Sequence, residues 1–551
     1  MQKTLLIGLD GVPLDLIKQW ANAGHLPNLQ RLMTQGTVGT LNSTVPHTSA
    51  PAWTSFMTGK NPGKTGIYDF LYRQPNTYTF YPNNGQARHG KTVWQLLSEH
   101  DKRVVVVNVP LTYPVEKING TLIGGWMTPY GRRDFTYPPS ILDELESKFG
   151  TYPIYPSETF SEKHPEKYLT ACRRLSDIRT DVALHLMEGQ TWDFFMTVYF
   201  DTDRILHQLW HYLDTSHRWR AKDTHVDKSI FVRQYFEHLD KNIGRLLEQV
   251  DNDTMVMVMS DHGMGIVNNM VVLNTWLLQQ NVLHLKQKAW TRIKQHLFNL
   301  GFTLRTVHIM ADKLGVAKHA EYKVMYSADK FLKKIFLSFD DVDWSKSQAY
   351  SFGRSVGPIY LNVKGREPHG IIEPGAEYER VRHEIAELAR NMTDPVSGLK
   401  LVREVLYRED VYHGAMAEHA PDLILQPTDE ANKFYGLSDF GSNQVLQPMY
   451  RYSGMHRQHG LLIMNGTKIS PQAMLNDAQI IDVAPTILHS LNVPVPTDMD
   501  GRVLLEAFTN PSEVKYHTVA DETHAHHLES SYTPEEAAEI ENRLRQLGYL
   551  E

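Results

Sequence analysis

Short, uninterrupted runs of apolar residues recur along the first half of the chain, with longer stretches of helical spacing between them. The apolar runs lie at residues 5–9, 103–108, 193–200 and 255–259, and the helical stretches include residues 13–35 and 169–188. An apolar run without alternation is typical of a strand that is covered on both faces, as in a parallel sheet. Strands that alternate with helices predict an α/β fold.

This alternation stops between residues 271 and 339, where lysines and arginines are interspersed among aromatic and aliphatic residues at helical spacing. We therefore expect three parts: a first core segment at 1–270, a helical insertion at 271–339, and a second core segment at 340–551. The insertion could cap a site, or turn a basic amphipathic face toward an anionic membrane or a partner. A helical subdomain with solvated lysines is the simplest interpretation and the one we favour.

The pattern resumes after the insertion. We expect strands at 359–363 and 422–425, helices at 375–390 and 480–491, and a last helix at 533–550. Thr533 and Glu536 have the spacing of a capping box, which supports the start of the last helix.

Composition narrows the class of protein. Of 551 residues, 41% are hydrophobic and 22% charged, which is ordinary for a soluble globular protein. A net charge of −7 favours no nucleic-acid partner. The single cysteine, Cys172, excludes an internal disulfide and a thiolate zinc site, so any metal must be bound by histidines and carboxylates.

The first residues predict a strand rather than a targeting segment. Their apolar run is short and meets Asp10 at once, whereas a signal peptide needs a longer run and a small-residue cleavage site. We find no apolar run long enough to span a bilayer, and we expect a cytoplasmic location.

Polar residues follow two of the predicted strands directly. Asp10 comes after the first strand, and Asp261 and His262 come after the strand at 255–259. In open α/β sheets, ligands bind outside the carboxyl ends of the strands, so these residues are candidates for chemistry. The alternative for Asp10 is an Asx turn or a helix cap.

Two further positions carry metal-binding side chains. Asp203 and His207 are four residues apart after the strand at 193–200, so in a helix they share one face, and His211 continues that face. The alternative is a helix that starts at a capping Asp and contains an incidental His. His456 directly precedes another buried strand.

A cluster of hydroxyls at residues 43–59 runs into a predicted short helix. Ser49 suits the N-cap, Pro51 the first turn and Gly59 the stop. A hydroxyl at a helix N-terminus lies where backbone N–H groups attract an anion, which suits a nucleophile that attacks phosphate. Taken alone, the stretch is better interpreted as a capped surface helix, and only the other candidate residues favour a nucleophile. Lys60 and Lys64, just beyond it, are expected to be solvated.

Together these residues make a set of oxygen and nitrogen ligands. Zinc and manganese accept carboxylate and imidazole without thiolate. Two such ions can clamp the attacking and leaving oxygens of an in-line phosphoryl displacement.

The motifs, in this order, resemble the alkaline phosphatase superfamily, and within it the type I phosphodiesterase/nucleotide pyrophosphatase group. The matching pieces are Leu9-Asp10-Gly11, Thr48-Ser49-Ala50-Pro51 with Thr58-Gly59 and residues 62–67, Asp203 with His207, Ser260-Asp261-His262-Gly263-Met264, and Gly454 with His456. The resemblance implies a mixed, mostly parallel central sheet flanked by helices on both faces, with the helical insertion added.

The resemblance also implies the roles of the residues. One metal would be held by Asp10, Ser49, Asp261 and His262, and the other by Asp203, His207 and His456. Both would be divalent, with Zn²⁺ expected first and Mn²⁺ second. Ser49 would be the nucleophile of a phosphohydrolase that passes through a phosphoseryl intermediate, and Thr48 is the alternative nucleophile.

The implied substrate is a small phosphoester, either a phosphodiester or a nucleotide pyrophosphate. Tyr68-Asp69-Phe70 follows Gly66-Ile67 where pyrophosphatases of the group have an Asn that touches phosphate. A phosphomonoesterase or a phosphomutase is therefore a close alternative. Trp53 stands where a sulfatase needs Arg, which argues against that branch. A non-catalytic protein that binds a membrane or partner through the insertion is the alternative of another class.

Overall fold

A nine-stranded sheet forms the base of the molecule, in the order β21-β2-β20-β9-β1-β8-β5-β6-β7. In this computed structural model, residues 3–219, 227–313, 334–438, 440–519 and 532–546 are described. The strands are β21 (Met474–Leu475), β2 (Thr37–Asn42), β20 (His459–Asn465), β9 (Met255–Met259), β1 (Thr4–Leu9), β8 (Phe194–Tyr199), β5 (Val104–Val109), β6 (Gly120–Gly124) and β7 (Thr136–Tyr137). Only β20 and β7 run antiparallel to their neighbours, so the mixed, mostly parallel sheet is confirmed.

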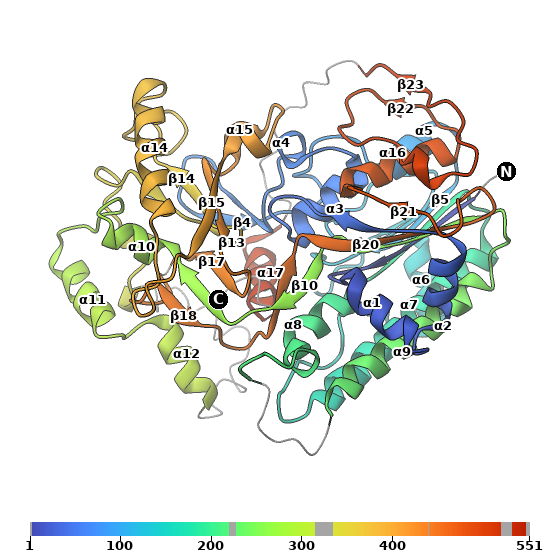
Figure 1. Cartoon of the computed structure of the whole chain (residues 1–551), viewed down its shortest axis with the longest axis horizontal. Coiled ribbons are helices and arrows are strands. Elements are labelled where there is room, and N and C mark those ends of the chain that lie inside the picture. Colours follow the sequence, from blue (N-terminus) through green and yellow to red (C-terminus); the bar gives the residue numbers. More distant parts are fainter. Residues whose placement is uncertain (1–2, 220–226, 314–333, 439, 520–531, 547–551) are drawn as a thin grey trace.

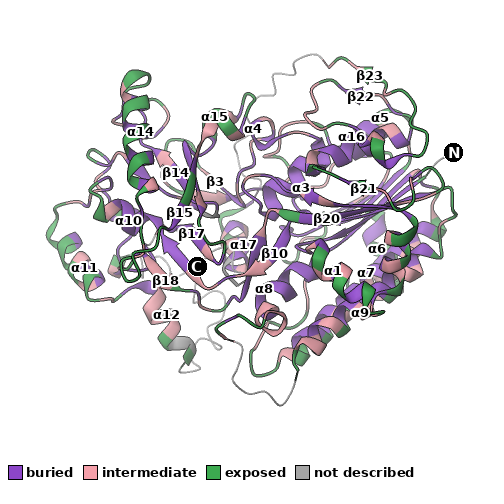
Figure 2. Ribbon diagram, viewed as in Figure 1, coloured by how far each residue is buried: buried purple, intermediate pink, exposed green. Residues whose placement is uncertain are grey.

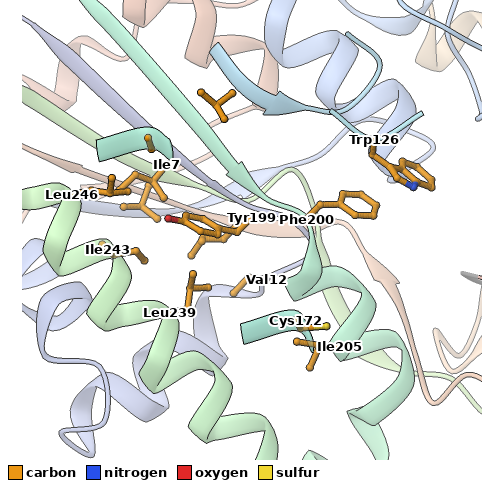
Figure 3. Close-up of a cluster of buried hydrophobic side chains, with 14 of the residues drawn as sticks. Ile7, Val12, Trp126, Cys172, Tyr199, Phe200, Ile205, Leu239, Ile243 and Leu246 are labelled. Carbon is orange, nitrogen blue, oxygen red and sulfur yellow. The ribbon is translucent and has the colours of Figure 1, made fainter. Parts of the chain in front are cut away.

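Helices cover both faces of this sheet (Figure 1). One face carries α1 (Leu14–Asn22), α2 (Pro27–Gln35), α6 (Ser140–Phe149), α7 (Pro165–Gly189) and α9 (Ser229–Leu247); the other carries α3 (Ser49–Thr58), α5 (Val93–Glu99) and α16 (Val483–Ser490). The residues of β1 alternate between the two cores, with Leu5 and Ile7 on one side and Leu6 on the other. Figure 3 shows part of the first core, where Leu239, Ile243 and Leu246 of α9 lie near the sheet.

The helix expected at 13–35 is in fact two helices, because the chain turns at Gly24, whose φ is +82°. The last helix, α17 (Pro534–Gln546), begins with the predicted capping box: the Thr533 N–H donates to Glu536 Oε2 at 2.9 Å, and the Glu536 N–H donates to Thr533 Oγ1 at 3.3 Å. Residues 547–550 of the predicted helix lie outside the described residues.

Two four-stranded sheets build a second lobe beside the first (Figure 1). Their strands are β13 (Gly353–Ser355), β17 (Asn432–Gly436), β11 (Asn269–Val272) and β18 (Leu446–Pro448), and β12 (Ala349–Tyr350), β14 (Pro358–Leu361), β16 (Leu423–Pro427) and β15 (Val402–Tyr407). The helices of this lobe are α10 (Leu273–Gln279), α11 (Ala289–Asn299), α12 (Leu304–Lys313) and α14 (Ala376–Arg390). Much of the outer surface of α14 is exposed, whereas the central strands β9, β1, β8 and β5 of the nine-stranded sheet are buried (Figure 2).

The segment 271–339 contains the expected helices, but it also shares a core with strands. Val271, Leu277 and Phe298 pack in one cluster with Ile359 and Leu425. Residues 314–333, with their lysines, lie outside the described residues, and the division of the chain at 270 and 339 stays a prediction. The second lobe therefore combines residues from both sides of residue 339.

A short ribbon and one helix lie between the two lobes, where Figure 1 places β10 and α8. The ribbon pairs β10 (Gly263–Ile266) with β19 (Gly454–Arg457), and α8 (Asp201–Leu213) packs against both strands. The remaining elements are short: α4 (Pro62–Thr65), α15 (Arg408–Val411), β3 (Leu71–Arg73), β4 (Phe80–Pro82), β22 (Val495–Pro496) and β23 (Tyr516–His517). Of the helices in the described ranges, none has the length and apolar character that a membrane crossing requires.

Candidate active site

Three adjacent parallel strands place the predicted residues at one edge of the large sheet. Asp10 directly follows β1, Asp261 and His262 lie between β9 and β10, and Asp203 is in the first turn of α8, which begins just after β8. Because β9, β1 and β8 are neighbours that run in the same direction, their carboxyl ends meet. The sheet order thus brings together residues 250 positions apart in the chain, such as Gly11 and Asp261.

Asp10, Ser49, Asp261 and His262 form a first buried cluster. Ser49 Oγ lies 3.2 Å from Asp10 Oδ1 and 3.1 Å from His262 Nε2. His262 Nε2 lies 3.6 Å from Asp10 Oδ1 and 3.4 Å from Asp261 Oδ2. All four side chains are fully buried, so a group that enters this cluster interacts with them out of bulk water.

Asp203, His207 and His456 form a second cluster. Asp203 Oδ1 lies 3.3 Å from His207 Nε2, which confirms the shared helical face, and 3.4 Å from His456 Nε2. The Nε2 atoms of His207 and His456 are 2.8 Å apart. His456 also brings the two clusters together, because its ring centroid is 3.9 Å from that of His262.

The helix α3 positions Ser49, with one correction to the expected geometry. Thr48 occupies the N-cap, with extended φ and ψ, and Ser49 is the first helical residue. Gly59 ends the helix in the left-handed region at φ +67°, as expected. The Thr48 hydroxyl is buried and makes no hydrogen bond with the part of the chain that the structure describes, whereas the Ser49 hydroxyl contacts both Asp10 and His262.

Backbone carbonyls determine which nitrogen of two histidines is protonated. His207 Nδ1 lies 2.8 Å from the Gly454 carbonyl, and His262 Nδ1 lies 3.0 Å from the Gly263 carbonyl. A carbonyl oxygen only accepts, so each Nδ1 carries the proton, and each Nε2 presents a lone pair to its cluster. This is the arrangement that holds a histidine ready to bind a metal ion.

The carboxylates of the site differ in their proton affinity. Burial, with repulsion from Asp261 and Asp203, raises the pKa of Asp10 well above its usual value. Burial also raises the pKa of Asp261, to about 6. Burial acts in the same direction on Asp203, but His207 and His456 outweigh it and hold the pKa of Asp203 well below its usual value. Burial and the neighbouring His262 lower the pKa of His456.

The donor set fits divalent cations. The candidate ligand atoms of Asp10, Asp261 and His262 lie within 4.8 Å of one another, and the same holds for Asp203, His262 and His456. Asp261 Oδ2 is buried without a hydrogen-bond partner, and among the described residues no lysine or arginine pairs with Asp10 or Asp261. Buried carboxylates require a compensating charge, which a cation would supply.

Sequence reasoning missed two residues that shape the site. Trp53 Nε1 donates to Asp10 Oδ2 at 2.6 Å, one helical turn beyond Ser49. Gly11 has φ +72°, its N–H donates to Asp261 Oδ1 at 3.2 Å, and a Cβ here would lie 2.7 Å from Asp203 Oδ1. The Asp-Gly pair signalled a turn, but only the fold shows that the turn brings the two clusters close together.

Three other sequence candidates lie elsewhere. The His211 ring packs near His217, at 5.9 Å between centroids. Lys60 and Lys64, expected to be solvated, pair instead with Asp498 and Asp500. None of these side chains belongs to the two clusters.

Comparisons with known proteins agree with this architecture. Phosphonoacetate hydrolase from Sinorhizobium meliloti 1021, solved with phosphonoacetate, matches with a TM-score of 0.53 and 13% identity over 89% of this chain and 95% of that chain. Human ectonucleotide pyrophosphatase/phosphodiesterase 5 matches with a TM-score of 0.49 and 11% identity over 92% of this chain and 100% of that chain. The first of these likenesses shows a shared fold. No curated protein sequence matches the chain.

The family model for type I phosphodiesterase/nucleotide pyrophosphatase matches residues 4–456, a span that contains every candidate site residue from Asp10 to His456. The prediction of a metal-dependent phosphoric ester hydrolase is confirmed at the level of the family. Since the match covers more than half of the sequence, the chain belongs to the type I phosphodiesterase/nucleotide pyrophosphatase family.

Proposed function

We propose that this protein is a two-metal phosphohydrolase that cleaves phosphodiester or nucleotide pyrophosphate bonds through a phosphoseryl intermediate on Ser49. The observation that carries the proposal is the position of the Ser49 hydroxyl, 3.2 Å from Asp10 Oδ1 and 3.1 Å from His262 Nε2, at the N-terminus of α3. A nucleophilic hydroxyl needs a neighbouring base and a site for the phosphate oxygens, and this position offers both.

The proposed ligand sets are Asp10, Ser49, Asp261 and His262 for one ion, and Asp203, His207 and His456 for the other. Divalent ions held there would neutralise phosphate charge and lower the pKa of a bound hydroxyl. The chemistry of the donors supports Zn²⁺ first and Mn²⁺ second, because imidazole suits zinc and carboxylate suits manganese.

The proposed reaction has two steps, in which Ser49 first attacks phosphorus and water then hydrolyses the intermediate. Ser49 Oγ forms a bond to phosphorus while the bond from phosphorus to the leaving oxygen breaks, and the Ser49 proton passes to Asp10 Oδ1. Asp10 Oδ1 lies 3.2 Å from Ser49 Oγ and is therefore positioned to accept that proton. Trp53 Nε1 fixes the other oxygen of Asp10. The proton on Asp10 passes to the leaving oxygen. Water then attacks phosphorus: its oxygen bonds to phosphorus as the bond to Ser49 Oγ breaks, and one of its protons restores the Ser49 hydroxyl. The product released in this step is a phosphomonoester, because the second substituent of the substrate stays on phosphorus.

Thr48 is a weaker candidate for the nucleophile. Its hydroxyl makes no hydrogen bond with any described residue, so none of them is positioned as a base to take its proton. The matched pair Ser49→Ala and Thr48→Val tests this choice. We expect Ser49→Ala to reduce turnover by at least about 10³-fold, and Thr48→Val to retain most of it.

The nature of the leaving group separates the proposal from its alternatives. Tyr68 occupies the region where pyrophosphatases of the group have a phosphate-binding Asn, and its hydroxyl donates to the Met416 carbonyl at 2.7 Å. The absence of that Asn at this position keeps a phosphomonoesterase as an alternative, and such an enzyme would prefer p-nitrophenyl phosphate over bis(p-nitrophenyl) phosphate. A phosphomutase would exchange phosphoryl groups without net release of phosphate.

The experiment measures hydrolysis of both p-nitrophenyl substrates with Zn²⁺ and with Mn²⁺, together with elemental analysis of the purified protein. We expect bound metal and faster cleavage of the diester. Absence of metal, with no cleavage of either substrate, would favour a non-catalytic binding protein instead.

A further inference from the structure

Exposed apolar side chains are concentrated on one segment of the second lobe. Of the eleven large apolar side chains that are exposed among the described residues, five lie between residues 290 and 310 and are 44% to 71% exposed: Trp290, Ile293, Leu300, Phe302 and Met310. Single exposed apolar residues are ordinary, whereas a group of them indicates a surface that meets a partner or a membrane. Three of the five belong to α11 and its C-cap, and Figure 1 places α11 at the outer edge of the second lobe.

The helix α11 buries one face and exposes an apolar stripe on another. Three of its residues, spaced by three and then four positions, are buried: Thr291, Lys294 and Phe298. The apolar stripe has the same spacing one position earlier and consists of Trp290, Ile293, Leu297 and, one turn further on, Leu300. One residue is a rotation of about 100° around the helix axis, so the stripe lies on a face of its own. Packing against the second lobe therefore leaves this apolar face in contact with solvent.

Basic side chains accompany the apolar stripe. Residues 286–313 contain six lysines and arginines and one acidic residue, Asp312, although the whole chain has a net charge of −7. Lys294 is compensated, because its ammonium lies 2.9 Å from Asp341. Lys288 and Arg292 share a third, exposed face of α11, four positions apart. This part of an acidic protein is thus suited to an anionic partner.

An anionic lipid bilayer fits both properties of this surface. A helix that lies in a membrane interface combines a face of Trp, Phe and Leu with lysines and arginines beside it. The Trp290 Nε1 already donates to the Lys334 carbonyl at 2.8 Å, so entry of the ring into lipid would leave no N–H without an acceptor. A nucleic acid would use the charge but leave the apolar stripe in water. We propose that α11 docks the protein on an anionic bilayer, with the apolar stripe among the lipid headgroups.

The proposal is independent of the proposed function, because α11 contributes no residue to the two clusters at Ser49 and Asp203. It revises the interpretation of the insertion that we favoured from the sequence, a helical subdomain with solvated lysines. The described part of the insertion has such lysines, but it also exposes Trp290, Ile293 and Leu300 beside them.

Vesicle flotation of the full chain tests the proposal. One set of vesicles is phosphatidylcholine alone, and the other is equal parts of phosphatidylcholine and phosphatidylglycerol. We expect partitioning onto the anionic vesicles to be at least about tenfold stronger, and to weaken as added salt screens the charges. Equal binding to both sets, or binding to neither, would overturn the proposal.

A pair of apolar substitutions tests the stripe itself. Ile293→Ser combined with Leu300→Ser should weaken binding to anionic vesicles by at least about tenfold. The matched control is Met474→Ser combined with Tyr516→Ser, because these side chains are similarly exposed, at 57% and 61%, but lie on the first lobe. The control should bind like the wild type, and an equal loss in both variants would contradict a role of the stripe.

A pair of charge reversals tests the basic face. Lys288→Glu combined with Arg292→Glu should weaken binding to anionic vesicles by at least about tenfold. Lys117→Glu combined with Lys163→Glu makes the same change in net charge on exposed lysines of the first lobe and should have a smaller effect. Equal effects would show that only the net charge matters and would overturn the assignment to α11. All of the substituted side chains are exposed, so the melting temperatures should stay close to that of the wild type.

Fluorescence shows which surface enters the lipid. Brominated lipids quench a tryptophan that lies in the bilayer, and we expect Trp290→Phe to bind the vesicles but to lose this quenching. Quenching that persists in Trp290→Phe would place another face of the protein on the membrane. Sedimentation without lipid provides a second check: a dimer that Ile293→Ser with Leu300→Ser converts to a monomer would assign the stripe to a second copy of the chain and overturn the proposal.

Discussion

The negative charge of a buried carboxylate is balanced differently in the second lobe and at the candidate active site. In the second lobe, Asp422 is fully buried, and Arg366 contacts it with two nitrogens, at 2.8 and 2.6 Å. Arg408 Nη1 is 3.2 Å from Asp422 Oδ1, and the Tyr378 hydroxyl donates to the same oxygen at 2.8 Å. At the candidate active site, Asp10 and Asp261 are equally buried, but none of the described lysines or arginines pairs with them.

The pKa values record this difference. Burial would raise the pKa of Asp422, but Arg366 outweighs it and lowers that pKa below its usual value. The pKa values of Asp10 and Asp261 are raised, because burial is joined by repulsion between carboxylates. The chain supplies the counter-charge for Asp422, so that residue stabilises the fold. It does not supply one for Asp10 and Asp261, which is the arrangement expected where the counter-charge is a bound cation.

The largest effect should come from Asp261→Asn. Removal of a proposed ligand should lower activity and metal affinity by more than about a hundredfold, since even residues that only support a ligand cost 10- to 100-fold. The metal-free variant should melt no lower than the metal-free wild type, because a repulsive charge has been removed. Kinetics, metal titration and calorimetry measure the three quantities. A large loss of metal-free stability would show that Asp261 is structural, like Asp422.

Asp422→Asn should show the reverse pattern. Arg366 would keep Glu367 at 2.9 Å but lose its second charged partner in a buried setting, at a cost of up to about 3–5 kcal/mol in the free energy of unfolding. Denaturant unfolding measures this cost. Metal content per folded molecule should stay at the wild-type level, and a selective loss of metal would contradict a purely structural role.

The stabilisation that metal provides should grow between pH 5 and pH 7. In the metal-free protein, the pKa values of Asp10 and Asp261 are higher in the folded than in the unfolded state. The stability that these two carboxyl groups contribute is therefore fully present below their unfolded pKa, about 4. For Asp261 it is lost as the pH rises through its folded pKa of about 6. A cation binds only their ionised forms. At a metal concentration of 100 Kd at pH 7, the gain should reach about 2.7 kcal/mol. Melting with and without Zn²⁺ across this range tests the sign, and a gain that shrinks with pH would contradict it.

We expect the smallest effect in the free energy of unfolding at low pH, where the Asp422 carboxylate becomes protonated. The folded pKa of Asp422 is lowered, so its contribution to stability is present above its unfolded pKa and is lost as the pH falls through the folded value. The wild type should lose up to about 1.4 kcal/mol per pH unit more than Asp422→Asn in this range. Unfolding at a series of pH values below 4 measures the two slopes, and parallel slopes would exclude this linkage.

Local patterns were sufficient for much of the fold and for the set of candidate residues. The apolar runs at 5–9 and 255–259 became β1 and β9, because a strand buried on both faces admits no polar position. The spacing of Asp203 and His207 placed both side chains on one face of α8, because 3.6 residues make a turn. Errors arose at boundaries, as at Thr48, which has the N-cap position expected for Ser49.

Local sequence patterns did not predict the contacts between segments that are distant in the chain. Arg366 lies 56 residues before Asp422, and nothing local distinguishes Asp422 from Asp10 as a buried aspartate. Residues 273–279, 289–299 and 304–313 are helical, as expected, but the core that this segment shares with strands of the second lobe arises from packing across the chain. Trp53 gained its significance only when the fold placed its Nε1 2.6 Å from Asp10 Oδ2.

The sequence by itself determined the class of fold, the family and the chemical types at the strand ends, because these depend on periodicity and on short motifs. The tertiary structure decided which charges are matched. Electrostatic compensation depends on distances of a few ångströms between residues that can be hundreds of positions apart, and burial makes each unmatched charge costly. The unmatched carboxylates of Asp10 and Asp261 could therefore be recognised only in the folded chain.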